Sequence, residues 1–387
     1  MSIFSTSKCA LFIALATLLW GFFSCGGPGA VGPTDSIPPA TSNTDNKTPS
    51  VVEQPSKPAV NTVSTYYGFW PYWIHPASYE PDWRGLTHLS YFSLEAVQGG
   101  TLDDQYIGTE YYKIRDTAHA HNVKVTLTIT CFDRDIQDEI LAYHQRELID
   151  NILKSVQEHG ADGVNVDIED VREINSFTHF SNTSLMQNFM ASLYAALKKA
   201  NPGYHISFCV MGGVEPPYRN PELSKYTDAV FLMGYDYHWS TSPVTGAVSP
   251  YGNPDDLSVD ESLSTLEKWY PKSQLILGLP FYGYDWPCSS SEPGAKTLGE
   301  GAIVYMQDAL IRASEYGRQF DAKTKSPWYR YQLKGSWHQC WYDDPESLAL
   351  KFNYVKSSGI AGVGYWALGY EGNGSPVWES VIKTFKR

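Results

Sequence analysis

The residues best suited to chemistry lie in one short run, residues 162–169, which reads DGVNVDIE. If the run is a strand, its side chains alternate between two faces, so Asn165, Asp167 and Glu169 point to the same side. The α-carbons of Asp167 and Glu169 are then about 6.6 Å apart, which lets their carboxyl groups interact. Paired carboxyls in a low-dielectric pocket differ in pKa, and one of them stays protonated near neutral pH. A general acid that cleaves a glycosidic bond needs this property.

A structural role is the alternative for these carboxylates. They could pair with cations in a polar layer of the fold, but the run 162–169 contains no Lys or Arg. Burying three polar side chains without such partners is costly. We therefore expect Asp167 and Glu169 to react, and Asn165 beside them to contact the substrate.

The elements that position these residues follow an alternating pattern. Apolar runs of strand length alternate with stretches such as 148–156 and 185–197, whose apolar residues recur at helical spacing. This pattern predicts an α/β fold, a (β/α)8 TIM barrel, with a doubly wound open sheet as the alternative. In such a barrel the site lies at the C-terminal ends of the strands. The predicted strands are 65–69, 86–92, 123–130, 163–168, 205–210, 229–233, 274–279 and 362–366.

One connection, between the last two predicted strands, is unusually long. It runs from Leu279 to Gly362, far more than a short loop and a helix require. Its segments 303–305 and 329–341 are rich in aromatic residues and favour strands. We predict a small α+β insertion at about residues 288–342, within a catalytic domain that spans residues 62–387.

The N-terminus has the pattern of an export signal followed by a tether. Residues 1–25 contain one basic residue, Lys8, and an apolar stretch that is too short to span a bilayer. The stretch ends at Cys25 in a context that resembles the lipobox of bacterial lipoproteins, although ordinary signal cleavage further along is the alternative. Residues 26–61 are rich in Gly, Pro, Ser and Thr and are predicted to be disordered. We expect a lipid anchor on Cys25 and a place in the bacterial cell envelope, lipid-anchored or secreted.

Composition narrows the range of ligands. The formal net charge of −13 argues against nucleic acid, which requires a surface rich in Lys and Arg. A neutral polysaccharide fits better, and the 27 Tyr and 12 Trp provide flat rings for sugars, although a large barrel also packs such rings in its core.

The cysteines lack the spacing of a metal site, so we expect no metal and no cofactor. Cys131 and Cys209 are expected as buried free thiols, whereas Cys288 and Cys340 could form a disulfide.

The run 162–169 resembles the signature of the family-18 glycoside hydrolases, which are chitinase-like enzymes. Three further landmarks of that family follow in order, at residues 233–236 (MGYD), 278–283 (GLPFYG) and 364–369 (GYWALG). The resemblance covers roughly residues 64–387. It is strongest to the bacterial branch that includes spore-peptidoglycan N-acetylglucosaminidases.

The resemblance implies a role for each matching residue. Glu169 would protonate the glycosidic oxygen, and Asp167 would orient the substrate's own 2-acetamido group for attack on the anomeric carbon, with retention of configuration. The resemblance also implies substrate contacts at Tyr235, which would bind the acetamido oxygen, and at Trp366, Asp236 and Tyr282. Trp70, with Tyr72 and Trp73, follows the first predicted strand and could extend the sugar-binding groove, with packing in the core as the alternative.

One position departs from the family pattern. Asn165 stands where most chitinases have Asp, so it cannot share an acidic proton with Asp167, and Asn165→Asp is expected to shift the acid limb of activity. The expected function is hydrolysis of β-1,4 bonds in polymers that contain N-acetylglucosamine: chitin, chitooligosaccharides or peptidoglycan. A non-catalytic, lectin-like barrel is the alternative, but lectin-like relatives typically lose the residue that corresponds to Glu169. Endo and exo action both remain open.

Overall fold

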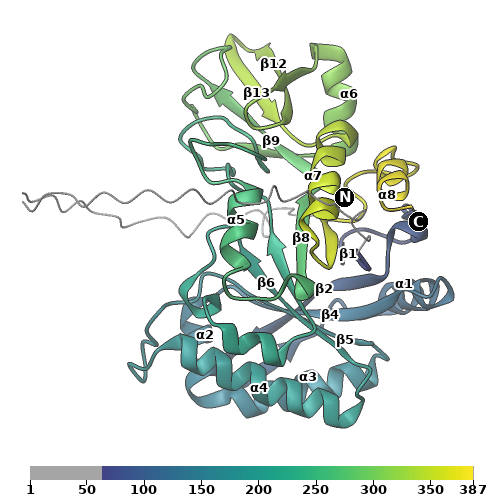
Figure 1. Cartoon of the computed structure of the whole chain (residues 1–387), viewed down its shortest axis with the longest axis vertical. Coiled ribbons are helices and arrows are strands. Elements are labelled where there is room, and N and C mark those ends of the chain that lie inside the picture. Colours follow the sequence, from purple (N-terminus) through teal and green to yellow (C-terminus); the bar gives the residue numbers. More distant parts are fainter. Residues whose placement is uncertain (1–62, 387) are drawn as a thin grey trace, which may run out of the picture. The chain divides into compact units, whose positions relative to one another are not determined.

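The computed structural model describes residues 63–386 (Figure 1). The predicted leader, the linker and Cys25 lie outside these described residues. Within residues 63–386, no helix is long and apolar enough to cross a membrane.

Eight parallel strands close into a barrel, as the sequence predicted. Hydrogen bonds join neighbouring strands in the order β1-β14-β8-β7-β6-β5-β4-β2, and the pairing of β1 with β2 closes the ring. A short strand, β3 (Thr101–Asp103), adds to β2 in the antiparallel direction. The barrel strands are β1 (Thr65–Pro71), β2 (His88–Val97), β4 (Lys124–Cys131), β5 (Gly163–Ile168), β6 (His205–Met211), β7 (Ala229–Met233), β8 (Leu275–Pro280) and β14 (Gly362–Trp366).

Helices lie between the barrel strands and pack against their outer face (Figure 1). In α4 (Asn182–Ala200), the residues at helical spacing that face the barrel are buried, among them Phe189 and Leu193. The sequence also marks both ends of α7 (Pro345–Ser358): Asp344 caps its N-terminus, and Gly359 follows its last turn with φ of 74°. The other helices around the barrel are α1 (Thr109–Ala120), α2 (Arg134–Glu139), α3 (Gln145–Glu158), α5 (Val259–Leu266) and α8 (Val377–Phe385).

Shorter helical turns complete the connections. A π-helical turn, η3 (Ile140–His144), joins α2 directly to α3. The 3-10 turns are η1 (Trp83–Gly85), η2 (Gln98–Gly100), η4 (Pro216–Tyr218), η5 (Pro221–Tyr226) and η6 (Lys272–Gln274).

The two faces of β5 separate apolar from polar residues, as its period-two pattern predicts. Val164, Val166 and Ile168 belong to the core between barrel and helices. Asn165 and Asp167 point the other way and are buried inside the barrel. At the start of the strand, a Cβ on Gly163 would lie 1.9 Å from the His205 carbonyl oxygen, so no larger residue fits there.

The long connection after β8 forms a second, antiparallel sheet, in the upper part of Figure 1. Its strand order is β10-β9-β13-β12-β11, and one helix, α6 (Met306–Tyr316), packs on it. This sheet begins at Tyr282, earlier than the predicted start near residue 288, because β9 follows β8 after a single residue, Phe281. Its strands are β9 (Tyr282–Cys288), β10 (Ala302–Tyr305), β11 (Gln319–Asp321), β12 (Ser326–Leu333) and β13 (Ser336–Trp341).

The cysteines of this sheet do not form the disulfide that was considered. Cys288 pairs with Trp337 across β9 and β13, whereas Cys340 pairs with Asp285. The two cysteines are therefore three residues out of register and lie on opposite faces of the sheet. All four cysteines of the described residues are buried free thiols, as predicted for Cys131 and Cys209.

Candidate active site

Glu169 is the first residue beyond the C-terminal end of β5, and its side chain is half-buried. Its backbone is held by Gln137 of α2, whose side-chain amide donates hydrogen bonds of 2.7 Å to the carbonyls of both Glu169 and Cys131. Gln137 is itself buried. The Glu169 carboxyl is thus set on a fixed backbone at the end of the barrel where TIM-barrel enzymes place their sites.

Asp167 lies two residues earlier on β5 and is only 4% exposed. Among the described residues, its Oδ1 atom has no hydrogen-bond partner. Burial raises the pKa of Asp167 to about 7, and the nearby charge of Glu215 acts in the same direction. A buried carboxyl oxygen without a partner is costly in the free protein, so it is available to a ligand.

The pKa of Glu169 is raised well above its usual value. Burial is the largest cause, and the negative charges of Asp167, Glu215 and Asp236 add to it. The two carboxyls interact, so they titrate as a coupled pair. That Glu169 is the member that keeps its proton stays a prediction from the sequence.

Glu215 was not predicted from the sequence. It follows β6, and its Oε1 atom accepts a hydrogen bond of 3.4 Å from the Asp170 backbone. Its Oε2 atom is buried and has no partner within the described chain, and burial raises its pKa. No motif marks this residue, since it reaches the carboxyl pair only through the pairing of β5 with β6.

Tyr235, Asp236 and Tyr282 form a second group at the same end of the barrel. Tyr235 and Asp236 follow β7 directly, and the rings of Tyr235 and Tyr282 are 6.2 Å apart with an edge-to-face arrangement. The Tyr282 hydroxyl donates a short hydrogen bond to Asp236. Burial raises the pKa of Asp236 to about 6 despite this bond. The negative charge of Asp236 also raises the pKa of Glu169, so the two carboxyl groups interact electrostatically.

Trp366 ends β14, and its half-buried ring packs against the barrel interior. It lies 5.6 Å from the Phe69 ring and 4.7 Å from the Phe92 ring. Phe92 in turn meets Trp73, which is 38% exposed, at 6.0 Å. A row of aromatic rings thus leads from Trp366 to the exposed Trp73. Phe92 was not expected in this row, because it lies in the middle of β2 and no motif marks it.

Trp70 does not join this row, which corrects the expectation that it contacts substrate. Its indole is 2% exposed, donates to the Ile74 carbonyl at 2.8 Å and packs edge-to-face on Tyr79. The reason is strand alternation: Phe69 faces the barrel interior, so the next residue faces the outer core. The Tyr72 ring stacks on the Tyr106 ring, with 3.5 Å between the ring centroids, so this face of Tyr72 is covered by the protein itself.

Asn165 requires a second correction. It was placed among the substrate-contacting residues, but it is completely buried and lies one step deeper in the barrel than Asp167. Its amide donates to Ser207 Oγ at 2.9 Å, and its carbonyl oxygen accepts from the Cys209 thiol at 3.2 Å. Asn165 can therefore influence a ligand only through the residues above it.

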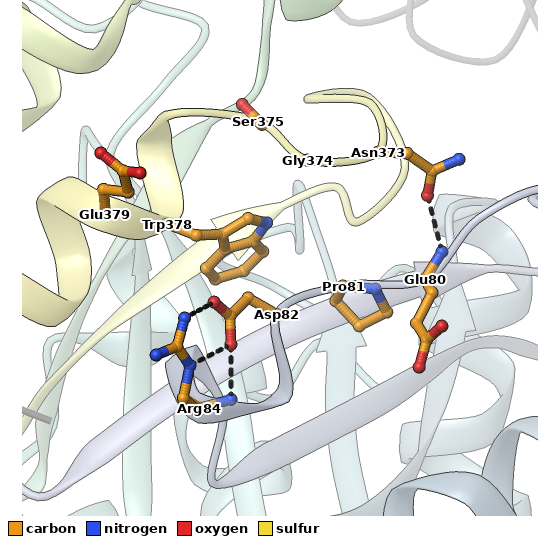
Figure 2. A pocket seen from close by; sticks show the side chains of 9 residues that line it. All are labelled: Glu80, Pro81, Asp82, Arg84, Asn373, Gly374, Ser375, Trp378 and Glu379. Carbon is orange, nitrogen blue, oxygen red and sulfur yellow. Dashed lines mark hydrogen bonds and ion pairs between the residues drawn. The ribbon is translucent and has the colours of Figure 1, made fainter.

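Figure 2 shows a shallow surface pocket that includes none of the predicted site residues. The Arg84 guanidinium and the Asp82 carboxylate form an ion pair within it. The pocket is lined by Glu80, Pro81, Asp82, Arg84, Asn373, Gly374, Ser375, Trp378 and Glu379.

In the part of the chain that the structure describes, no cluster of three or more His, Cys, Asp or Glu residues could hold a metal ion.

A closed parallel barrel with a carboxyl pair at the C-terminal end of its fourth strand suits a glycoside hydrolase. Comparison with known proteins identifies the family. The sequence matches Glycosyl hydrolases family 18 over residues 63–371. This chain belongs to that family.

Individual relatives agree with this assignment. The chain is 30% identical over 299 residues to the cortical fragment-lytic enzyme of Bacillus anthracis, a match that covers 73% of this chain and 65% of the relative. It is 24% identical over 224 residues to the di-N-acetylchitobiase of Mus musculus, covering 53% of this chain and 60% of the relative. The crystal structure of the Bacillus cereus spore cortex-lytic enzyme SleL has the same fold, with a TM-score of 0.67 and 24% identity, over 84% of this chain and 75% of that one. The chain thus spans slightly less than two thirds of the length of these curated relatives.

Proposed function

We propose that this chain is a retaining glycoside hydrolase that cleaves β-1,4 bonds in polymers containing N-acetylglucosamine. The observation that carries the proposal is the carboxyl pair: Asp167 has a pKa of about 7, and that of Glu169 is raised well above its usual value. Near and above neutral pH, one site then offers both a carboxylate and a proton donor.

In the first step, Glu169 gives its proton to the glycosidic oxygen as the bond to the anomeric carbon breaks. The acetamido oxygen of the same sugar forms a bond to that carbon, while the Asp167 carboxylate accepts the acetamido N–H. In the second step, the Glu169 carboxylate removes a proton from a water molecule that attacks the anomeric carbon. The ring formed by the acetamido group then opens, and the β configuration is restored.

The neighbouring side chains have matching roles in this proposal. Tyr235, half-buried beside Tyr282, would hydrogen-bond the acetamido oxygen. Trp366 offers its ring as a floor for the reacting sugar, since a flat ring packs well on the C–H face of a pyranose. Asp236 and Tyr282, which bond to each other, would contact that sugar or its neighbour.

Glu169→Gln tests the proposal, because Gln keeps the shape of the side chain but has no acidic proton. We expect hydrolysis of an N-acetylglucosamine tetramer to fall by at least about a thousandfold. Proton NMR of the first products should show the β anomer in the active protein. Binding of the tetramer without hydrolysis by the unmodified protein would favour the lectin-like alternative, and hydrolysis that survives Glu169→Gln would exclude this mechanism.

Two relatives support a choice between the possible substrates. The cortical fragment-lytic enzyme of Bacillus anthracis covers more of this chain than the chitobiase of Mus musculus does, at 73% against 53%. We therefore favour peptidoglycan over chitin. Incubation with purified peptidoglycan and with chitin oligomers, followed by identification of the new reducing ends, distinguishes the two substrates.

The predicted anchor is part of the same proposal. A lipid on Cys25 would hold the barrel at the bacterial envelope, where peptidoglycan is available. Cys25→Ala should release the protein from the membrane fraction and abolish metabolic labelling with a fatty acid. Unchanged fractionation and labelling would exclude the anchor without affecting the catalytic proposal.

A further inference from the structure

The interior of the barrel beneath Asp167 contains a chain of hydrogen bonds. In this chain, the Tyr67 hydroxyl forms hydrogen bonds with Thr126 Oγ1 at 2.8 Å and with Ser207 Oγ at 3.2 Å. Ser207 in turn accepts the Asn165 amide at 2.9 Å. All four side chains are fully buried, so this network is fixed by the fold.

This network determines what Asn165 can do. Its donor group is used by Ser207, so the carbonyl oxygen points to the opposite side, where it accepts the Cys209 thiol at 3.2 Å. The amide carries a second N–H, but within residues 63–386 Asn165 forms no hydrogen bond with Asp167. Most chitinases have an Asp at position 165 that can share a proton with the residue corresponding to Asp167. Here Asn165 stands in its place, and the nearest other side chain with a proton to donate comes from a neighbouring strand.

Cys209 of β6 is that neighbour. It is 3% exposed, and its thiol donates to the Asn165 carbonyl oxygen at 3.2 Å. Asp167 is its neighbour on β5, because Val166 and Phe208, one residue earlier on each strand, pair in the parallel ladder. The buried Asp167 Oδ1 atom has no partner within the described residues, so it is open to a donor from this side. A thiol has a single proton to donate, so it serves one acceptor at a time. A carboxylate is the stronger acceptor, since hydrogen bonds to charged groups exceed neutral ones in strength.

We propose that Cys209 is a positioning residue for Asp167: its thiol donates to the Asp167 carboxylate when that group is ionised and returns to Asn165 when Asp167 is protonated. No covalent step is involved, and the thiol keeps its proton throughout. Burial and the charges of Asp167 and Glu169 raise the pKa of the thiol well above its usual value, so it remains a donor.

The other titratable groups near Asp167 are two carboxyls and two tyrosines. Glu169, just beyond β5, and Glu215, after β6, are carboxyls, and the charge of Glu215 opposes the ionisation of Asp167. Tyr235 after β7 and Tyr218 of η4 also lie close enough to sense its charge. The Tyr218 hydroxyl donates to the Ile168 carbonyl at 2.6 Å, so its proton is already in use. The Cys209 hydrogen bond is the contact that lowers the pKa of Asp167, against burial and Glu215.

The first test needs no substrate. The Asp167 carboxyl pKa is measured by NMR on protein labelled with carboxyl-¹³C aspartate, with Asp167→Asn used to assign the signal. Cys209→Ala should raise this pKa by about half a unit or more, since a donor to the ionised form is lost. Cys209→Ser, which keeps a donor, should restore most of the shift. Cys209→Val is the substitute if the cavity left by Ala prevents folding.

The kinetic test rests on the proposed function. In Cys209→Ala, the acid limb of kcat/KM should move to higher pH by the same amount, while the alkaline limb stays in place. Cys131→Ala is the matched control, because it removes a buried thiol from β4 that faces the outer core. An Asp167 pKa that is equal in Cys209→Ala and the unmodified protein overturns the inference. An inactive protein whose Asp167 pKa still shifts would reject the proposed function and leave this inference standing.

Discussion

The side-chain amide of Gln137 donates a hydrogen bond of 2.7 Å to the backbone carbonyl of Glu169. The same amide also bonds the Cys131 carbonyl at the end of β4, so one buried side chain ties two strand ends together. Gln137→Met removes both donors at similar length. We expect the free energy of unfolding to fall by about 1 to 3 kcal/mol. We also expect kcat to fall about tenfold or more, because Glu169 is displaced.

Gln145 provides a matched control for this variant. Its amide also bonds two backbone carbonyls, those of Leu141 and Leu185, at 2.7 and 3.2 Å, but none of these residues belongs to the site. Gln145→Met should lower stability to a similar degree and leave kcat unchanged. Equal losses of kcat in both variants would show that Gln137 acts through general stability alone.

Activity should have its maximum on the alkaline side of neutrality. The mechanism needs Asp167 ionised and Glu169 protonated, and burial raises the pKa of Asp167 to about 7. The acid limb of kcat/KM is therefore expected near pH 7. The alkaline limb reports the loss of the Glu169 proton, and burial together with the negative charge of Asp167 raises the pKa of Glu169 well above its usual value. Initial rates on an N-acetylglucosamine oligomer between pH 4 and 10 measure both limbs. A maximum below about pH 5 would contradict these assignments.

The opposite end of the barrel should limit stability in acid. His88 and His205 begin β2 and β6, their ring centroids are 4.5 Å apart, and burial lowers the pKa of each to about 3. These histidines bind protons more readily in the unfolded chain than in the folded protein. Their contribution to the free energy of unfolding is therefore fully present above about pH 6.5 and is lost as the pH falls towards 3. His205→Gln should reduce the loss of unfolding free energy between pH 7 and 4 by at least about 1.4 kcal/mol.

His75→Gln is the control for this prediction, since the His75 side chain is 58% exposed. Urea unfolding of the three proteins at both pH values gives the comparison. The same acid loss in His205→Gln and in the unmodified protein would show that other groups dominate.

Two tryptophans distinguish sugar binding from core packing. Trp366→Ala should lower kcat/KM about ten- to a hundredfold, because it removes a half-buried ring at the end of β14. Trp70→Phe removes the buried indole N–H that bonds Ile74, so it should lower the melting temperature and leave KM unchanged. Steady-state kinetics and thermal unfolding of both variants provide the test. A raised KM in Trp70→Phe would restore Trp70 to the substrate site.

The barrel could be predicted from the sequence because each strand is an apolar run of its own, separated from the next by a helical pattern. Asp167 and Glu169 could be singled out because they are two residues apart at the end of one strand and match a family signature. Gln137, Glu215 and Cys209 could not, since each reaches the pair from another element through tertiary packing. No local pattern distinguishes them from ordinary buried or loop residues.

Trp70 shows a different limit. It was expected just after a strand that ends at residue 69, whereas β1 continues to Pro71 and includes it. The face on which Trp70 lies depends on which of its neighbours points into the barrel. That neighbour, Phe69, is apolar like Trp70, so the usual contrast between polar and apolar faces is absent at this position.

The short bond between Asp236 and Tyr282 joins the segment after β7 to the first residue of the antiparallel sheet. Backbone bonds from Phe281 to Trp366, at 2.7 Å, and from Met306 to Phe281, at 2.8 Å, attach the same region to the barrel. An engineer who replaced this sheet with one from a relative would therefore exchange part of the sugar-contacting wall as well. Substrate preference and turnover would then change together in such a chimera.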